Sequence, residues 1–182
     1  PCVITVCADV HRFSMWCEQR DAEPCYDNFA WFLIGVTDAL LAAQNLCVEA
    51  EAHGLGICYL GTTIYTAEEI ARILDLPKGV IPVTTIVVGH PDESPELTDR
   101  LPLDAVVHCE KYHHYTSSEI DELWAEKETS EETRRLLEEN GLPNLAQIFT
   151  RNRYRAEDNL AISRNYFALL KKQGFFYIYR KS

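Results

Sequence analysis

A long apolar segment between residues 26 and 53 is the sequence feature that most restricts the fold. Hydrophobic side chains recur there at helical spacing and cover most of the helix circumference. They are Phe29, Phe32, Leu33, Val36, Leu40, Ala43, Leu46 and Ala50. Asp27 or Asn28 can cap the start, and Gly54 is a typical C-terminal stop. Such a helix is buried, or it packs against two partners at once, such as its own core and a second subunit.

Strands are predicted on both sides of this helix. β-branched residues with Cys and Ala predict a strand buried on both faces over Cys2–Ala8, and a second strand is expected over Val80–Gly89. Gly56–Leu60 is a short connector or strand. The aromatic run Phe175–Tyr179 predicts a short terminal strand without an obvious partner in its own chain.

The other helices follow from capping signals and amphipathic patterns. Thr66-Ala67-Glu68-Glu69 has the pattern of a capping box and predicts a helix that ends near Leu74. Further helices are expected over Ser117–Glu128, Glu131–Asn140 and about Ala156–Gln173. The order of elements predicts a mixed α/β or α+β core over residues 1–115, followed by a helical C-terminal extension over residues 116–182.

Charge and cysteine content restrict the partners and the compartment. The chain has 28 acidic and 17 basic side chains, a net charge of −11, which disfavours nucleic acid and anionic membranes. Seven cysteines without a CxxC pair indicate reduced thiols and a cytoplasmic setting. No stretch approaches the unbroken apolar length of a transmembrane helix, so we expect no membrane. Because Pro1 leads directly into a predicted strand, we expect that upstream sequence exists.

Several residues could carry chemistry, each with a structural alternative. The glycines of Gly54-Leu55-Gly56 and of Tyr59-Leu60-Gly61-Thr62-Thr63 let a backbone approach a ligand, although a tight helix-to-strand turn is the favoured explanation for the glycines alone. A metal could be bound by His108, Cys109, His113 and His114, but the spacing matches no closed zinc pattern and favours surface or interface histidines. Cys58 is a conceivable nucleophile without an adjacent base, so packing is favoured. Exposed or local charge is the simpler interpretation for His11-Arg12, for Arg100 and for the basic run from Arg151 to Arg155.

The order of these segments resembles the flavin-dependent nitroreductase family. The similarity rests on Asp38–Leu46 (DALLAAQNL), Glu49–Gly56 (EAEAHGLG), Tyr59-Leu60-Gly61, Leu74–Pro77, Val83–Pro91 and Arg100-Leu101-Pro102 with Val107-His108. The late Lys172-Gln173-Gly174-Phe175 is similar to the tail of NADPH-dependent flavin reductases and oxygen-insensitive nitroreductases of that family. The resemblance covers most of the chain and is densest from Asp38 to His108.

This resemblance implies an α+β fold with a mixed central sheet flanked by helices, and a homodimer that binds FMN. It further implies ping-pong hydride transfer from NAD(P)H through FMN to nitroaromatic, quinone or flavin acceptors. The segment Tyr59-Leu60-Gly61-Thr62 would lie on the flavin ring, with the N–H groups of Gly61 and Thr62 at its N5 and O4 edge. Arg100 would pair with the FMN phosphate.

Two departures from the family pattern give an alternative. Thr98 stands where relatives of this subgroup carry Lys, which removes one cation for the phosphate. The family's N-terminal arginine- and serine-containing segment has no counterpart in this sequence. The alternative function is therefore a non-catalytic flavin-binding or structural homologue that has lost part of the FMN site.

Overall fold

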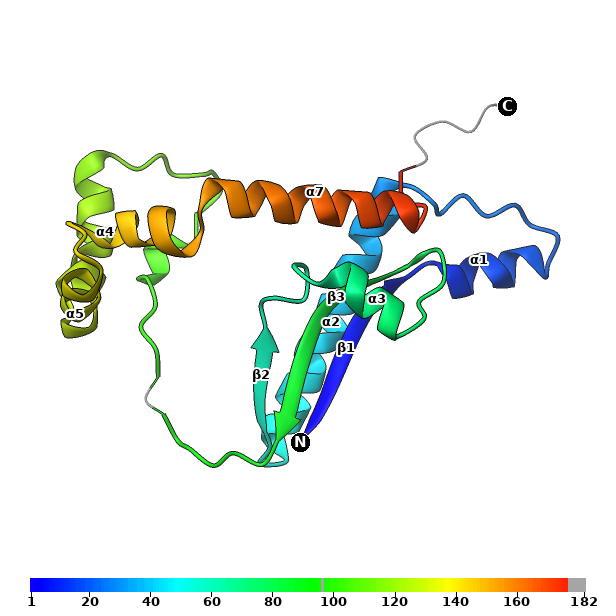
Figure 1. Ribbon diagram of the computed structural model, residues 1–182, viewed down its shortest axis with the longest axis horizontal. Coiled ribbons are helices and arrows are strands. Elements are labelled where there is room, and N and C mark those ends of the chain that lie inside the picture. Colours follow the sequence, from blue (N-terminus) through cyan, green and yellow to red (C-terminus); the bar gives the residue numbers. More distant parts are fainter. Residues whose placement is uncertain (96, 177–182) are drawn as a thin grey trace. The chain divides into compact units, whose positions relative to one another are not determined.

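The structure is a computed structural model that describes residues 1–95 and 97–176 (Figure 1). It contains two compact units. The sheet unit comprises Pro1–Glu93 and Leu160–Ser182, and the helical unit comprises Ser94–Asn159. The expected boundary between residues 115 and 116 falls inside the helical unit, and the division of the chain by function stays a prediction.

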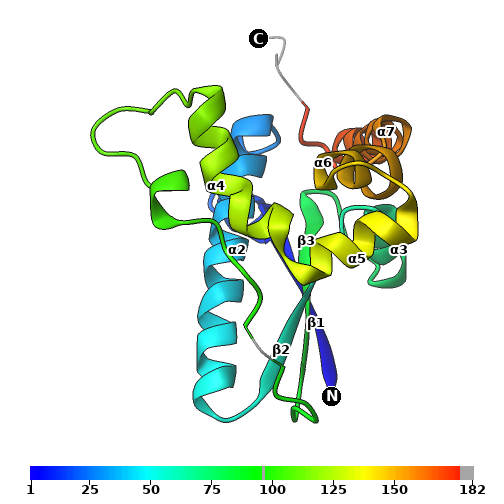
Figure 2. The same cartoon turned by 90° about the vertical axis from the view of Figure 1, so that its left-hand side faces the viewer.

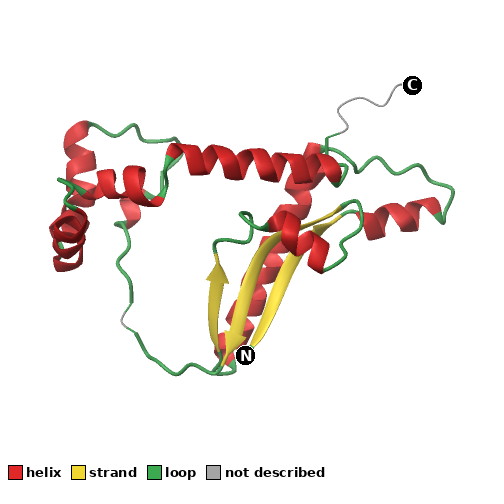
Figure 3. Ribbon diagram, viewed as in Figure 1, coloured by secondary structure: helices red, strands yellow, loops and turns green. Residues whose placement is uncertain are grey.

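The sheet unit is built on three antiparallel strands in the order β1-β3-β2 (Figure 3). The predicted strands are confirmed as β1 (Cys2–Asp9), β2 (Gly56–Leu60) and β3 (Val80–Gly89). β3 is central and buried along most of its length, whereas β1 lies at an edge and leaves Val3 66% exposed. The expectation that residues 2–8 are buried on both faces is therefore wrong. Local residue preference predicts a strand, but burial depends on what covers it.

Helix α2 (Phe29–Ala52) lies along one face of the sheet and confirms the predicted long helix (Figure 2). The side chain of Asn28 accepts a hydrogen bond from the Trp31 N–H at its start, and Gly54 turns the chain after its end with φ of 73°. The buried side of the helix packs on Ile86 and Val88 of β3 through Ala43, Cys47 and Ala50. The outer side exposes Leu33, Ile34, Leu40, Leu41 and Val48.

α2 is also long and apolar enough to cross a membrane when judged by length and composition alone, with 22% of the apolar window buried. The expectation that no stretch approaches this length is therefore wrong. Length and composition do not separate a membrane span from a helix of a globular core, which passes the same test. The contacts of α2 with all three strands are those of a core helix.

A second core of the sheet unit joins α3 (Ala67–Ile73) and α7 (Ala156–Lys172) to the start of β3. After α7, Gly174 turns the chain back with φ of 90°, and Phe175 becomes completely buried, with its ring centroid 5.6 Å from that of Phe32. The predicted terminal strand is therefore wrong for Phe175 and Phe176, which form a turn in the core of their own chain. Residues 177–179 of that prediction lie outside the described residues.

Helix α1 (His11–Glu18) follows β1 and was not predicted. Val10 offers no side-chain cap and the first turn holds no acidic residue, but the Asp9 carboxylate just before the helix accepts from the Arg12 N–H at 3.1 Å, a start signal that the sequence reasoning missed.

The helical unit contains α4 (Ser117–Thr129), α5 (Glu131–Asn140) and α6 (Leu145–Ile148), preceded by a short 3₁₀ helix η1 (Leu103–Ala105). A single π-helical turn, η2 (Phe149–Arg153), follows α6. The helices predicted for residues 117–128, 131–140 and 156–173 are confirmed. Together with the sheet they confirm the α+β class.

One of two similar sequence patterns forms a capping box. Thr116 and Glu119 cap α4 reciprocally, through the Thr116 side chain and the Glu119 carboxylate. The box predicted at Thr66 is wrong, because Thr66 makes no side-chain cap bond and the Glu69 carboxylate pairs with Arg72 instead. The helix itself forms as predicted, as α3.

Candidate functional site

The loop that follows β2 is a tight, self-bonded turn. The Leu60 carbonyl oxygen accepts hydrogen bonds from the Thr63 N–H at 3.4 Å and from the Thr63 hydroxyl at 3.0 Å. Thr63 is 4% exposed, so these bonds lie in a protected environment. The Tyr65 N–H donates to the Thr62 carbonyl oxygen at 2.9 Å. The buried Thr63 therefore fixes the position of the exposed residues Gly61 and Thr62.

Gly61 is a glycine that the chain's own structure does not require. The chain has eight glycines, all within the described residues. Four adopt positive φ (Gly54, Gly79, Gly141 and Gly174), and Gly35, Gly56 and Gly89 lie so close to other atoms that an added Cβ would meet one within 3.3 Å. At Gly61 the backbone is not left-handed, and an added Cβ would meet nothing within 4 Å. A small residue there leaves the loop backbone open to close approach from outside.

The same loop offers two backbone donors. Neither the Gly61 N–H nor the Thr62 N–H donates a hydrogen bond to another residue in the part of the chain that the structure describes. Both residues are exposed. Two adjacent unpaired N–H groups on a fixed turn suit an electron-rich atom or the edge of a flat polar ligand.

Tyr59 anchors the start of this loop to helix α2. Its hydroxyl donates to Gln44 Oε1 at 3.4 Å. The nearby buried Cys47 thiol, together with desolvation, raises the pKa of Tyr59 to about 12. The phenol, neutral at physiological pH as tyrosines ordinarily are, serves as a hydrogen-bonding link. The side chain of Leu60 is partly exposed, at 37%.

Thr98 and Arg100 lie in the helical unit, and the structure brings these two residues together. Arg100 Nη1 donates to the Thr98 hydroxyl, to the Thr98 carbonyl oxygen at 3.3 Å and to the Asp99 carbonyl oxygen at 2.9 Å. Arg100 is exposed and makes no ion pair with any described residue. Its guanidinium is therefore held by its own loop and keeps donors for an anion. The loop from Tyr59 to Thr62 belongs to the sheet unit.

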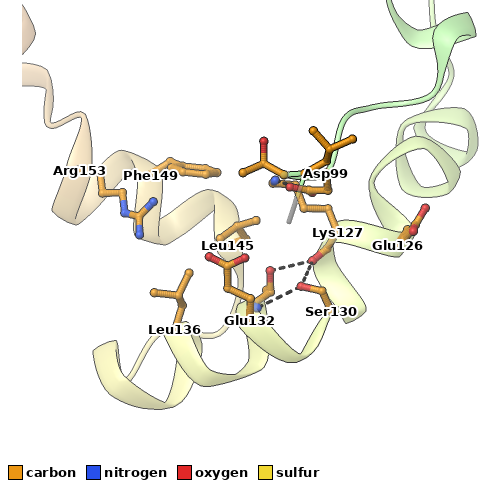
Figure 4. A pocket seen from close by; sticks show the side chains of 12 residues that line it. Asp99, Glu126, Lys127, Ser130, Glu132, Leu136, Leu145, Phe149 and Arg153 are labelled. Atoms are coloured by element: carbon orange, nitrogen blue, oxygen red, sulfur yellow. Dashed lines mark hydrogen bonds and ion pairs between the residues drawn. The ribbon is translucent and has the colours of Figure 1, made fainter. Parts of the chain in front are cut away.

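A pocket of about 420 Å³ in the helical unit includes Thr98 and Asp99 in its wall. Asp99 and Lys127 face each other on one side of it, and Arg153 lies beside Phe149 on the other (Figure 4). The Lys127 ammonium nitrogen is 2.7 Å from Asp99 Oδ2 and holds the pKa of that carboxyl below its ordinary value of 3.8. The Arg153 guanidinium carbon lies 5.7 Å from the centre of the Phe149 ring, a cation–π contact.

The remaining candidates form no second site. No group of three or more potential metal ligands gathers among the described residues. The His113 ring nitrogen Nε2 lies 3.0 Å from Glu119 Oε1, so it is engaged with a carboxylate. The backbone N–H of His113 donates to His108 Nδ1 at 3.3 Å. Cys58 is an exposed free thiol. In the pair His11-Arg12, the backbone N–H of Arg12 donates to the Asp9 carboxylate at 3.1 Å. In the basic run, Arg155 is paired with Asp158 at 2.8 Å and Glu157 at 3.3 Å.

Sequence reasoning did not find the contribution of Asp99 and Lys127. These residues are 28 positions apart, and Lys127 looks like any solvated lysine on an amphipathic helix. The link from Tyr59 to Gln44 and Cys47 was also missed. The chain turns back between α2 and β2 and the two elements pack on each other, so residues near the end of the helix could have been expected beside the strand.

The chain is similar to known proteins in sequence and in structure. Residues 32–90 match the family model described as the nitroreductase family. A curated relative, the FMN reductase (NADPH) of Bacillus subtilis, is 35% identical over 109 residues, which are 59% of this chain and 44% of that protein. The chain thus spans less than half the length of this curated relative.

Two solved structures extend the similarity over nearly the whole chain. A crystal structure of a candidate oxidoreductase from Bacteroides fragilis is 46% identical with a TM-score of 0.93, covering 96% of this chain and 71% of that one. The NfrA1 nitroreductase of Bacillus subtilis is 26% identical with a TM-score of 0.78, covering 95% of this chain and 69% of that one. The resemblance found in the sequence is thereby confirmed, and the chain belongs to the nitroreductase family.

Proposed function

We propose that the protein is an FMN-dependent NAD(P)H oxidoreductase that binds flavin at the loop from Tyr59 to Thr62. One observation carries this proposal: Gly61 is not required by the fold, yet it opens a loop with two unpaired backbone donors. The similarity to a protein named FMN reductase (NADPH) supports the same cofactor and co-substrate.

The donor set of this loop fits a flavin. The Gly61 and Thr62 N–H groups would hold the N5 and O4 edge, where electron density increases on reduction, and fixed donors of this kind need no reorganisation during the reaction. When bound, FMN supplies two-electron transfer from NAD(P)H to a nitroaromatic, quinone or flavin acceptor by a ping-pong scheme. Tyr59 and Thr63 keep the donors in place through their bonds to Gln44 and Leu60.

Arg100 and Thr98 are the proposed contacts of the FMN phosphate. A phosphate monoester adds almost two negative charges to a chain of net charge −11, so a local cation must offset an unfavourable field. The planar guanidinium of Arg100 can hold two phosphate oxygens, and the neighbouring Thr98 hydroxyl can add a neutral contact.

The basic run of the helical unit favours NADPH over NADH. Because Arg155 is already paired with Asp158 and Glu157, the cations offered to a ligand are Arg151 and Arg153. Arg153 and the Phe149 ring line the same pocket as Thr98. A cation beside an aromatic ring suits a 2′-phosphate next to an adenine.

The outer face of α2 is the proposed interface of a homodimer. Its exposed aliphatic side chains lie on the part of the helix circumference that the sheet does not cover. A second copy of the chain would cover these side chains, and the end of α7 would add to the contact. With α2 covered in this way, we place the protein in the cytoplasm, without a membrane or nucleic-acid partner.

A flavin titration tests the proposal. Protein with FMN should absorb in the flavin bands and be bleached by NAD(P)H, whereas stable flavin colour that neither pyridine nucleotide bleaches would support the non-catalytic alternative. Arg100→Ala should weaken FMN by about 10- to 150-fold, the loss expected for hydrogen bonds to a charged group, with Arg100→Lys in between. Riboflavin, which has no phosphate, should bind Arg100→Ala and wild type equally. Equal weakening of both flavins would show that Arg100 is structural.

A further inference from the structure

We propose that Asp99 and Lys127 form a positioning pair that holds the Arg100 guanidinium in place for the cofactor phosphate. This inference rests on the proposed function of Arg100. It assigns a role to helix α4, whose Lys127 contacts Asp99 in the loop that contains Thr98 and Arg100. Neither member of the pair needs to touch the cofactor itself.

Asp99 connects the helix to the arginine through two different atoms. Its carboxylate Oδ2 lies 2.7 Å from Lys127 Nζ, and its backbone carbonyl oxygen accepts from Arg100 Nη1 at 2.9 Å. An aspartate carboxyl is ionised at neutral pH, and the hydrogen bond with Lys127 lowers the pKa of Asp99 further, so the pair is charged under working conditions. A displacement of Asp99 would therefore remove a hydrogen-bond acceptor that orients Arg100.

Lys127 is mounted on a fixed corner between two helices. Its backbone carbonyl oxygen accepts from the Ser130 hydroxyl at 3.0 Å and from the Thr133 hydroxyl at 2.7 Å. Ser130 also caps α5 through the Thr133 N–H, and Thr133 is 3% exposed. Figure 4 shows these bonds beneath the Lys127 side chain. The corner gives Lys127 a defined position from which to hold an otherwise irregular loop.

Lys127 has a simpler alternative role, as a second cation for the phosphate in place of the family lysine that Thr98 replaces. The two roles predict opposite effects for the removal of Asp99. If Lys127 binds phosphate directly, loss of the Asp99 carboxylate frees the ammonium group and strengthens FMN binding. If the pair positions Arg100, loss of either partner weakens FMN binding, although the two variants change the net charge in opposite directions.

The experiment measures dissociation constants of FMN and riboflavin for Asp99→Ala, Lys127→Met and Lys127→Arg. Arg135→Met is the matched control, since it breaks an exposed ion pair of the same unit, with Glu139 at 3.8 Å, and changes the charge as Lys127→Met does. We expect Asp99→Ala and Lys127→Met each to weaken FMN by about two- to fivefold, the range of a partly exposed ion pair. All of these variants should bind riboflavin as tightly as wild type does. Lys127→Arg and Arg135→Met should also bind FMN as tightly as wild type does.

A double-mutant cycle completes the test. In an Arg100→Ala background, Asp99→Ala and Lys127→Met should have no further effect on FMN, because the residue they position is gone. Stronger FMN binding by Asp99→Ala, or equal weakening of FMN and riboflavin, would overturn the inference. If Arg100→Ala lowers FMN affinity selectively while both pair variants leave it unchanged, the inference fails and the proposed phosphate contact stands. If Arg100→Ala itself has no selective effect, the phosphate contact fails as well.

Discussion

Replacing Leu41 by Asp on the outer face of α2 should dissociate the proposed homodimer. Leu41 is 63% exposed and Val48 57%, while Leu33, Ile34 and Leu40 are each exposed by nearly half. Together these five residues leave the equivalent of about two and a half aliphatic side chains uncovered, so a covering subunit would gain about 4–8 kcal/mol per protomer. Loss of the Leu41 share alone is about 1–2 kcal/mol, and it occurs twice in a symmetric dimer.

The expected weakening is therefore about 30- to 1000-fold in the dimer dissociation constant, before the cost of burying a carboxylate is added. Sedimentation or light scattering across micromolar concentrations measures it. Leu103→Asp is the matched control, because Leu103 is 70% exposed but belongs to the helical unit and is no part of α2. The reasoning is refuted if wild type is a monomer at these concentrations, or if Leu41→Asp associates as tightly as wild type.

Three further predictions concern single loops and caps. Gly61→Val should weaken FMN binding by about tenfold or more, because the valine side chain would overpack against the ligand. The melting temperature should stay near that of wild type, because an added Cβ at this position meets nothing within 4 Å in the chain. A matching loss of stability would contradict this prediction. Thr116→Ala should destabilise the protein by about 1 kcal/mol in urea unfolding and Thr66→Ala by clearly less, since only Thr116 makes a side-chain cap bond. The stability that ionised Glu119 contributes should be complete above its ordinary pKa of 4.5 and lost as pH falls through its lowered pKa, so that wild type and Glu119→Gln converge in acid; a gap that persists there would disprove the capping role.

Most elements could be predicted because their signals are local. The bounds of β3 and α5 match the sequence pattern, and α2 is marked by a capping Asn28, a terminal Gly54 and helical periodicity between them. The errors concern what lies against an element. Val3 has the residue type of a buried strand but lies at an edge, and Phe175 looks like part of an unpaired strand but fills its own core.

The candidate site divides in the same way. Gly61 stands out in the sequence only through the family pattern, because a glycine in a turn has several explanations, and the structure removes the conformational and steric ones. The Asp99–Lys127 pair joins an irregular loop to a helix that begins 18 residues later, and no periodicity or motif relates them. Ion pairs between distant segments depend on the packed fold, so sequence patterns alone do not predict them.

The chemical shift of the Gly61 amide on addition of FMN is the most direct test of the proposed flavin site. Protein labelled with ¹⁵N-glycine has eight signals from the chain, and the loss of one in Gly61→Ala assigns Gly61. Because its N–H has no partner among the described residues, we expect this signal to move strongly on FMN binding, while that of Gly141, at the end of α5, stays in place. A Gly61 signal that does not move while FMN binds would contradict the proposed site.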